Sequence, residues 1–170
     1  EARGLKASHK VGLIGGDLPG WLLDQIDLVV ISPGVPKTTL PARYVDRKDG
    51  EVIGEVELAY RFLKGRIVGI TGSNGKTTTT ALIGEILKAA GLPTQVGGNI
   101  GTPLLDLFEN SRDDGWTIVE LSSFQLETIV DFRCDIALCL NVTPNHLDRY
   151  DSFLDYAAAK HRIFLNQRAE

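Results

Sequence analysis

Apolar residues along the chain gather in short runs that are not interrupted by polar ones. The clearest runs are Leu28–Ile31, Ile67–Ile70, Thr117–Val119 and Ile136–Val142. Because β-branched residues are frequent in them, these runs predict strands. Strands that are apolar throughout are typical of parallel sheets with helices on both faces. We therefore expect an α/β fold of parallel sheets with flanking helices.

Between the strands, two segments show the 3.6-residue period of amphipathic helices. The first covers Thr77–Ala90 and ends before Gly91, which favours a left-handed stop. Its predicted apolar side consists of Leu82, Ile83, Ile86, Leu87 and Ala90. The second covers about residues 152–166, and its predicted apolar face consists of Phe153, Tyr156, Ala157 and Phe164. A shorter helix is expected over Glu55–Leu63.

A change from loop-like to helix-like composition near residues 50–55 predicts a domain boundary. The segments Ser32–Pro36 and Asp46–Gly50, which precede it, have the composition of loops. We expect residues 1–54 to be the C-terminal part of one domain and residues 55–170 the N-terminal part of the next. The chain starts at Glu1 and has no methionine, so we expect it to begin and end inside a longer protein.

Composition and charge narrow the class of protein. The chain is 43% hydrophobic and 24% charged, which is typical of a soluble domain with a core. Its net charge of -4 and the lack of a Lys/Arg block argue against nucleic acid as a partner. Its apolar runs are too short to span a membrane. Cys134 and Cys139 are predicted to be buried thiols, which fits a cytoplasmic protein.

A phosphate-binding loop is the strongest chemical signal. The segment Thr71–Thr77, TGSNGKT, follows a predicted strand and opens a predicted helix. In such loops, backbone amides and the helix N-terminus face the phosphates, a lysine binds the outer phosphates and a hydroxyl binds Mg²⁺. The lysine and the hydroxyl here are those of Lys76 and Thr77. The common pattern has a glycine at the position of Ile70, so this loop is a variant.

Two further polar residues follow strands at the same predicted sheet edge. Glu120 comes directly after Val119, and His146 comes shortly after Val142. Ligands gather at the carboxyl ends of parallel strands, and a carboxylate there is well placed to bind a metal beside phosphates. Taken alone, Glu120 is equally well explained as a strand-end charge and His146 is better explained as structural. Their convergence on one edge favours the metal role for both.

Lys160 and the segment Gly97–Pro103 each allow two interpretations. Lys160 lies in the middle of an apolar helix face, where a lysine by default extends its amine to solvent. The alternative is that it points into the active site, in a chemically modified form. Gly97–Pro103 is either an ordinary loop or a place where the backbone approaches a ligand, with Asn99 as donor and acceptor.

Together these segments resemble the Mur ligases, the ATP-dependent amide-bond ligases of peptidoglycan precursor synthesis. Thr71–Thr77 is similar to the variant phosphate loop of that family. The segments that resemble its D-glutamate-adding member are GGNIGTP at 97–103, ELSSFQLE at 120–127, NVTPNHLDRY at 141–150 and YAAAK at 156–160. The resemblance is weak before residue 50 and strong after residue 65.

The resemblance implies roles for the matching residues. ATP would contact Gly72, Ser73, Asn74, Gly75, Lys76, Thr77 and Thr78. One Mg²⁺ would be held by Thr77 and Glu120, and a second by His146 together with a carbamylated Lys160. The catalytic residues would be Lys76, His146 and Lys160. The muramoyl substrate would contact Asn99 and Ser122, and its UDP moiety would contact Ser32, Pro33 and Gly34. No metal role is expected of Asn145, where the family often has an acidic residue.

The implied reaction joins D-glutamate to UDP-N-acetylmuramoyl-L-alanine. ATP would phosphorylate the substrate carboxylate to an acyl phosphate, which the amine of D-glutamate would attack. The implied architecture is a P-loop NTPase-like central domain preceded by part of a Rossmann-like domain. Such ligases also have a C-terminal domain, and we expect it to be absent from these 170 residues. We therefore expect the fragment to be inactive, and we expect the full-length enzyme to be a monomer.

Three alternatives remain. Another Mur ligase or a folylpolyglutamate synthase-like ligase would share the loop, but is not expected to combine GGNIGTP with ELSSFQLE. A nucleotide-sensing module without catalysis would not need Glu120 and His146. A P-loop kinase would need a phosphoryl-acceptor site and usually a Walker B aspartate, and neither is recognisable.

Overall fold

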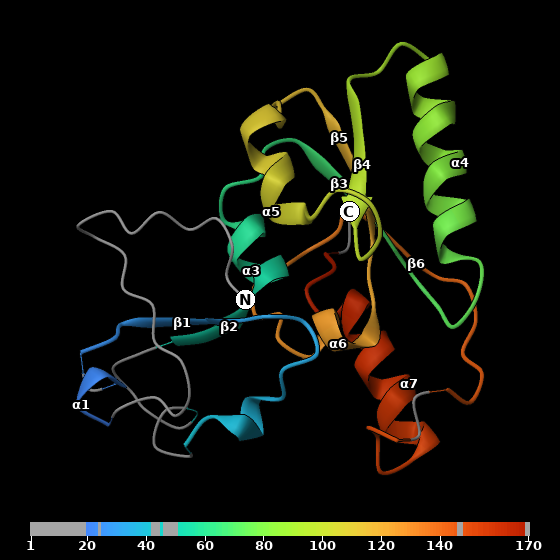
Figure 1. Ribbon diagram of the computed structural model, residues 1–170. Coiled ribbons are helices and arrows are strands. Elements are labelled where there is room, and N and C mark those ends of the chain that lie inside the picture. Colours follow the sequence, from blue (N-terminus) through green and yellow to red (C-terminus); the bar gives the residue numbers. More distant parts are fainter. Residues whose placement is uncertain (1–19, 24, 42–44, 46–50, 146–147, 169–170) are drawn as a thin grey trace.

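The computed structural model of the protein describes residues 20–23, 25–41, 45, 51–145 and 148–168 (Figure 1). Its main body is a four-stranded sheet with the strand order β4-β5-β3-β6, and a smaller sheet pairs β1 with β2. Every strand pair in both sheets is parallel. The predicted α/β class with parallel sheets and flanking helices is confirmed.

The elements follow one another as strand and helix in turn. The larger sheet contains β3 (Arg66–Thr71), β4 (Thr94–Gly98), β5 (Trp116–Glu120) and β6 (Ile136–Cys139). The helices beside it are α3 (Glu55–Tyr60), α4 (Lys76–Ala89), α5 (Leu104–Leu107), α6 (Ser123–Leu126) and α7 (Phe153–His161). The smaller sheet contains β1 (Leu28–Ile31) and β2 (Glu51–Gly54), preceded by α1 (Gly20–Leu23). Single turns of 3₁₀ helix cover Lys37–Thr39, Phe108–Asn110 and Arg162–Phe164.

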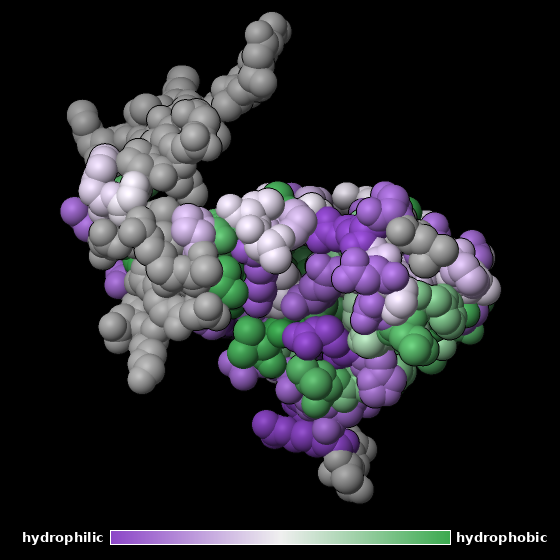
Figure 2. Space-filling view, turned by 90° about the horizontal axis from the view of Figure 1, so that it is seen from below, coloured by the Kyte–Doolittle hydropathy of each residue, from purple (hydrophilic) through white to green (hydrophobic). Residues whose placement is uncertain are grey.

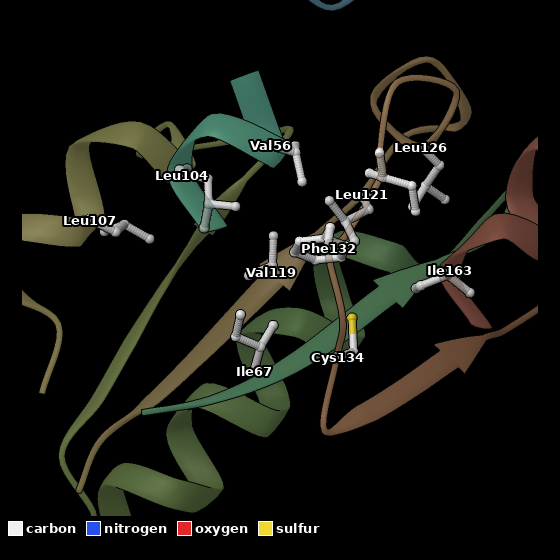
Figure 3. Packing of buried hydrophobic residues seen from close by; sticks show 12 residues of the cluster. Val56, Ile67, Leu104, Leu107, Val119, Leu121, Leu126, Phe132, Cys134 and Ile163 are labelled. Atoms are coloured by element: carbon white, nitrogen blue, oxygen red, sulfur yellow. The ribbon is translucent and has the colours of Figure 1, made fainter. Parts of the chain in front are cut away.

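Both faces of the larger sheet are buried beneath helices. Helix α4 lies on one face, and α3 and α5 lie on the other (Figure 1). Neighbouring residues of a strand point to opposite faces. Ile67 therefore joins the core beneath α3 and α5, where Val56 and Leu104 point towards Val119 (Figure 3). Val68 joins the core beneath α4. This two-sided burial explains why the strands are continuous apolar runs.

The apolar side predicted for α4 is wrong in part. Ile83 and Leu87 do pack against the sheet, but Leu82 and Ile86 are 59% and 56% exposed, and Ala90 is exposed. The side that faces the sheet consists of Thr80, Ile83, Gly84 and Leu87. Small residues take the central places because the helix lies close to β4 there, and any side chain at position 84 would meet Val96.

The segment after β6 also differs from the prediction. Strand β6 ends at Cys139, three residues before the predicted end at Val142, because the chain there turns to bond with the phosphate loop. Helix α7 ends at His161, and its buried side consists of Tyr156, Ala159 and Lys160. Phe153, predicted to lie on that side, is 38% exposed. Cys134 is buried as predicted, whereas Cys139 is only partly buried.

Strands β2 and β4 were not predicted, since both mix polar residues and glycine with few apolar ones. The predicted loop Asp46–Gly50 lies outside the described residues. Strand β2 belongs to the smaller sheet and ends at Gly54, and α3 follows it directly. The division into domains at residue 54 stays a prediction.

The surface seen from below mixes hydrophilic and hydrophobic side chains (Figure 2). Among the described residues, no helix combines the length and the hydropathy that crossing a membrane requires.

Candidate active site

The loop between β3 and α4 has the geometry of a phosphate-binding loop. Gly75 has a φ of +83°, a conformation that favours glycine, and α4 begins at Lys76, one residue earlier than predicted. The first turn of a helix leaves its amides without intrahelical acceptors, which applies here to Lys76, Thr77 and Thr78. The loop therefore offers backbone donors and the positive end of a helix to an anion.

Asn141, two residues after β6, fixes the other half of this loop. Its Oδ1 accepts a hydrogen bond from the Asn74 amide at 2.9 Å, and its Nδ2 donates to the Asn74 carbonyl at 3.0 Å. Its backbone carbonyl accepts from the Ser73 amide at 3.0 Å. The amides of Ser73 and Asn74 are thus bound within the protein. Amide donors for a phosphate therefore come from the part of the loop after Asn74.

Glu120 and Thr77 meet beside the loop. Thr77 Oγ1 donates to Glu120 Oε2 at 2.8 Å, and Asn99 Nδ2 donates to Glu120 Oε1 at 3.3 Å. Glu120 is 2% exposed, and the ion pairs found in the described part of the chain do not include it. A buried carboxylate needs a compensating charge, and hydroxyl and carboxylate oxygens are ligands that Mg²⁺ prefers. The two residues fit a shared Mg²⁺.

Lys160 points towards the phosphate loop, so the default orientation to solvent is wrong, whereas the chemical modification of its amine stays a prediction. Its side chain is 2% exposed, and its Nζ donates to the Gly72 carbonyl at 2.9 Å. The Nζ also lies 4.8 Å from the centre of the Tyr156 ring. Burial, together with the charge of Lys76, lowers the pKa of Lys160 to about 8. This shift of the pKa favours the neutral form of the amine compared with an exposed lysine.

A cavity of about 230 Å³ joins the predicted groups of residues. Ser73, Lys76 and Lys160 line it from the phosphate loop and α7, and Asn99 and Ser122 line it from the ends of β4 and β5. Two of the residues predicted for ATP, Ser73 and Lys76, thus share one cavity with the two residues predicted for the muramoyl substrate. Their roles there stay predictions.

Two glycines of the segment Gly97–Pro103, at positions 97 and 98, allow close contacts within the protein. Gly98 ends β4 with a φ of +115°, and a Cβ at this position would lie 2.3 Å from the Glu120 carbonyl oxygen. This close approach lets the Asn99 amide donate to that carbonyl at 2.8 Å. The backbone therefore approaches Glu120 itself, and it presents the Asn99 side chain to the Glu120 carboxylate.

Ser122 has a local structural role as well as its place in the cavity. Its Oγ accepts from the Gln125 amide at 3.3 Å, and the Gln125 side chain accepts from the Ser122 amide at 3.0 Å. This reciprocal pair is a capping box, which starts α6 directly after β5. The cap orients the segment that follows Glu120.

Ser32, Pro33 and Gly34 form an exposed turn after β1. The Val35 amide closes the turn on the Ser32 carbonyl at 3.1 Å. None of the three belongs to the described lining of the cavity. Their predicted contact with a UDP moiety stays a prediction.

His146 lies outside the described residues, so its predicted metal role is not placed. Within the described part of the chain, no three histidine, cysteine, aspartate or glutamate side chains gather into a metal site. The second Mg²⁺ predicted for His146 and Lys160 stays a prediction.

Comparison with known proteins decides the family. The profile described as "Mur ligase middle domain" matches residues 70–170 of this chain. The chain belongs to the Mur ligase family. Its larger sheet, phosphate loop and cavity all lie within or next to the matched residues, so the predicted family is confirmed.

Two similar relatives of this Mur ligase chain carry the same name. A UDP-N-acetylmuramoylalanine–D-glutamate ligase of Solibacter usitatus is 62% identical over 148 residues, which cover 87% of this chain and 34% of the relative. The ligase of the same name from Acidobacterium capsulatum is 61% identical over 142 residues, which cover 83% of this chain and 31% of the relative. The chain thus spans about a third of the length of these relatives.

Solved structures of Mur ligases share the fold. A UDP-N-acetylmuramate:L-alanyl-γ-D-glutamyl-meso-diaminopimelate ligase of Neisseria meningitides superposes with a TM-score of 0.55 at 18% identity, over 88% of this chain and 52% of that one. A UDP-N-acetylmuramoyl-L-alanyl-D-glutamate–2,6-diaminopimelate ligase superposes with a TM-score of 0.51 at 24% identity, over 81% of this chain and 38% of that one. At these identities the likeness supports the fold alone.

Sequence reasoning missed the residues that hold this Mur ligase site in place. No role in the site was predicted for Asn141, although it lies in the segment 141–150 that resembles the family. None was predicted for Tyr156 either, whose Oη lies 3.1 Å from Ser73 Oγ. Arg149 was also missed. The available signal was the density of polar residues directly after an apolar strand. That signal marks a site, but it does not say which residues bind ligand and which bind backbone.

Proposed function

We propose that this chain supplies the nucleotide- and Mg²⁺-binding part of an ATP-dependent ligase in peptidoglycan precursor synthesis. The ligase adds D-glutamate to UDP-N-acetylmuramoyl-L-alanine through an acyl phosphate. The observation that carries this proposal is the contact between Thr77 and Glu120 beside the phosphate loop. Asn99, which donates to Glu120, lines the cavity together with Ser122. The names of the relatives support D-glutamate as the added amino acid.

The residues of the loop would hold and orient the triphosphate. The first amides of α4 would donate to phosphate oxygens, and Lys76, whose Nζ bonds to the Ser73 carbonyl at 3.3 Å, would move to the outer phosphate. Thr77 and Glu120 would hold one Mg²⁺. When bound, Mg²⁺ neutralises charge that develops on the phosphate oxygens. The protein contributes positioning and charge compensation.

The surroundings of Lys160 support the carbamylation that the family resemblance implies. A neutral lysine amine adds to CO₂ and releases a proton, which leaves an anionic carbamate. The lowered pKa of Lys160 favours the neutral amine, and its place beside Gly72 and Lys76 would set the carbamate next to a cation. The carbamate oxygens would then be ligands for the second Mg²⁺, together with His146.

The ligase reaction is tested on a chain extended to the full length of its relatives. We expect ATP-dependent phosphate release with UDP-N-acetylmuramoyl-L-alanine and D-glutamate, and not with L-lysine, diaminopimelate or L-alanine. Glu120→Gln is expected to lower kcat about a hundredfold or more, since it removes a charged metal ligand without a change of size. Glu109→Gln, at an exposed site, is the matched control.

Release of phosphate with a different amino acid would contradict the D-glutamate assignment. Full activity of Glu120→Gln would contradict the metal role. We expect the 170 residues alone to bind nucleotide without turnover, because they span about a third of these relatives. Turnover by the isolated chain would overturn that expectation.

A further inference from the structure

Arg149 joins three separate parts of the molecule. Its Nη1 donates to the Gly34 carbonyl at 2.6 Å, across 115 residues of sequence. Its Nη2 donates to Glu127 Oε2 at 3.2 Å. Its guanidinium carbon lies 4.2 Å from the centre of the Phe124 ring. One side chain thus holds the turn after β1, the residue after α6 and an aromatic ring of α6.

The partners of Arg149 are themselves held in place. The Tyr150 hydroxyl donates to Glu127 Oε1, so both carboxylate oxygens of Glu127 are bonded. Burial and the bond to Glu127 raise the pKa of Tyr150, which keeps its hydroxyl a proton donor. The Tyr150 ring stacks on Phe124 with centroids 6.0 Å apart. Arg149 therefore binds to a fixed platform of Phe124, Glu127 and Tyr150.

The platform continues to the phosphate loop. The rings of Tyr150 and Tyr156 meet with centroids 5.4 Å apart, and Tyr156 Oη lies 3.1 Å from Ser73 Oγ. Ser73 Oγ in turn accepts from the Thr143 amide at 3.0 Å. Direct contacts thus lead from the Gly34 carbonyl through Arg149 to the loop that holds phosphates.

The contacts at this place suit an arginine. A guanidinium donates from two nitrogens in a fixed plane while the same plane lies over an aromatic ring. A lysine has one nitrogen, so it cannot donate from two separate nitrogens of one rigid plane as the guanidinium does. The side chain of Arg149 is 20% exposed and that of Glu127 is 30% exposed, so solvent screens the pair only in part.

We propose that Arg149 is a positioning residue for the UDP-muramoyl substrate. It fixes the turn Ser32–Val35 at a set distance from the phosphate loop, so that the UDP end and the reacting carboxylate end of one substrate fit at the same time. This role rests on the proposed function and on the predicted contact of Ser32, Pro33 and Gly34 with the UDP moiety, which the family resemblance implies. Arg149 itself is not assigned a contact with the reacting atoms.

The contact is tested without the reaction, on the 170-residue chain. Amide hydrogen exchange of Val35 reports on the turn, because this amide bonds to the Ser32 carbonyl. In Arg149→Lys we expect this amide to exchange about tenfold faster, the ratio that corresponds to one charge-assisted hydrogen bond. The control is Arg112→Lys, at an exposed arginine that pairs with Asp114 two residues away. Unchanged exchange in Arg149→Lys overturns the proposal.

The role is tested on the full-length ligase by separate binding measurements. In Arg149→Lys the Kd of UDP-N-acetylmuramoyl-L-alanine is expected to rise about tenfold. The Kd of ATP and the kcat at saturation are expected to stay within about threefold. Equal losses for both ligands, or a fall in kcat with an unchanged Kd for the UDP substrate, overturn the proposal.

A second variant guards against loss of folding. Glu127→Gln keeps an acceptor for Tyr150 but removes the charge that holds Arg149. We therefore expect faster exchange of the Val35 amide and a higher Kd of the UDP substrate, both to a smaller extent than in Arg149→Lys. A Glu127→Gln variant that binds the UDP substrate like the wild type overturns the proposal. If the wild-type enzyme forms no amide bond with D-glutamate, the proposed function fails, whereas the exchange of Val35 still decides whether Arg149 fixes the turn.

Discussion

Several side chains near the site bind backbone, and so give loops without regular structure a defined shape. Asn141 does so for the phosphate loop. Glu57, which is fully buried, accepts hydrogen bonds from the amides of Val130, Asp131 and Phe132. Arg162 donates to the carbonyls of Leu126 and Ile129. Buried backbone groups need partners, and these side chains supply them where no sheet or helix does.

The substitution Asn141→Asp tests whether the side chain of Asn141 gives the phosphate loop its shape. The substitution keeps the size of the side chain, but it sets a second oxygen against the Asn74 carbonyl in place of a donor, and it adds negative charge near the phosphates. We expect the affinity of the 170-residue chain for an ATP analogue to fall about tenfold or more, measured by calorimetry. Asn110→Asp, at an exposed turn, should stay within about twofold. Wild-type affinity in Asn141→Asp would show that the loop keeps its shape without this clamp.

Packing of helix α4 on the sheet is decided by small residues as much as by apolar ones. Gly84 is buried against Val96, and Thr80 is buried as well, which brings Ile83 and Leu87 onto the sheet. Because α4 is oriented in this way about its own axis, Ile86 lies on the surface. The same helix presents its N-terminus to the cavity, so its packing also sets the position of Lys76 and Thr77.

Two isoleucines of α4 offer a matched pair. Ile83→Ala removes contacts with the core beneath the helix and is expected to lower the free energy of unfolding by about 1–2 kcal/mol, less than for a fully buried isoleucine. Ile86→Ala removes a side chain that is 56% exposed. This substitution is expected to change the free energy of unfolding by less than about 0.5 kcal/mol. Urea denaturation of the 170-residue chain measures both. Equal losses would mean that α4 packs as the apolar pattern alone predicts.

For the molecule as a whole, the active-site edge collects segments from distant parts of the chain. The carboxyl ends of β3, β4 and β5 deliver the phosphate loop, Asn99 and Glu120 to one place. Helix α7 adds Lys160 from further along the sequence. The smaller sheet is tied to the rest through Arg149, and through an ion pair between Glu51 of β2 and Arg61. A ligand at this edge therefore stabilises the assembled chain.

Binding of Mg²⁺ and ATP should raise the melting temperature. A ligand at about a hundred times its Kd stabilises a protein by about 2.7 kcal/mol, which for a chain of this size corresponds to roughly 5–10 °C. Removal of Mg²⁺ with a chelator is expected to abolish most of the shift, and Glu120→Gln should lose the part that depends on Mg²⁺. Differential scanning calorimetry measures this. A shift of the same size without Mg²⁺ would contradict a metal held by Thr77 and Glu120.

Local pattern was sufficient for much of the fold and for the centre of the site. The apolar runs predicted four of the strands, and the parallel order that they imply placed the carboxyl ends of β3 and β5 at one edge. This is why Thr77 and Glu120 were expected to be neighbours, 43 residues apart in sequence. Strands β2 and β4 were not predicted because few of their residues are apolar. They are strands because each pairs with a neighbouring strand.

Local pattern did not decide the direction of side chains that meet across long sequence separations. Lys160 has the same sequence context whether its amine faces solvent or the Gly72 carbonyl, and only the packing of α7 against the loop settles it. Arg149 and Asn141 gain their roles from backbone groups far away in the chain. The sequence by itself determined four of the strands and the phosphate loop, and its resemblance to known motifs indicated the family. The tertiary structure decided which polar residues face the cavity and which hold it in shape, because that choice depends on partners that no local pattern contains.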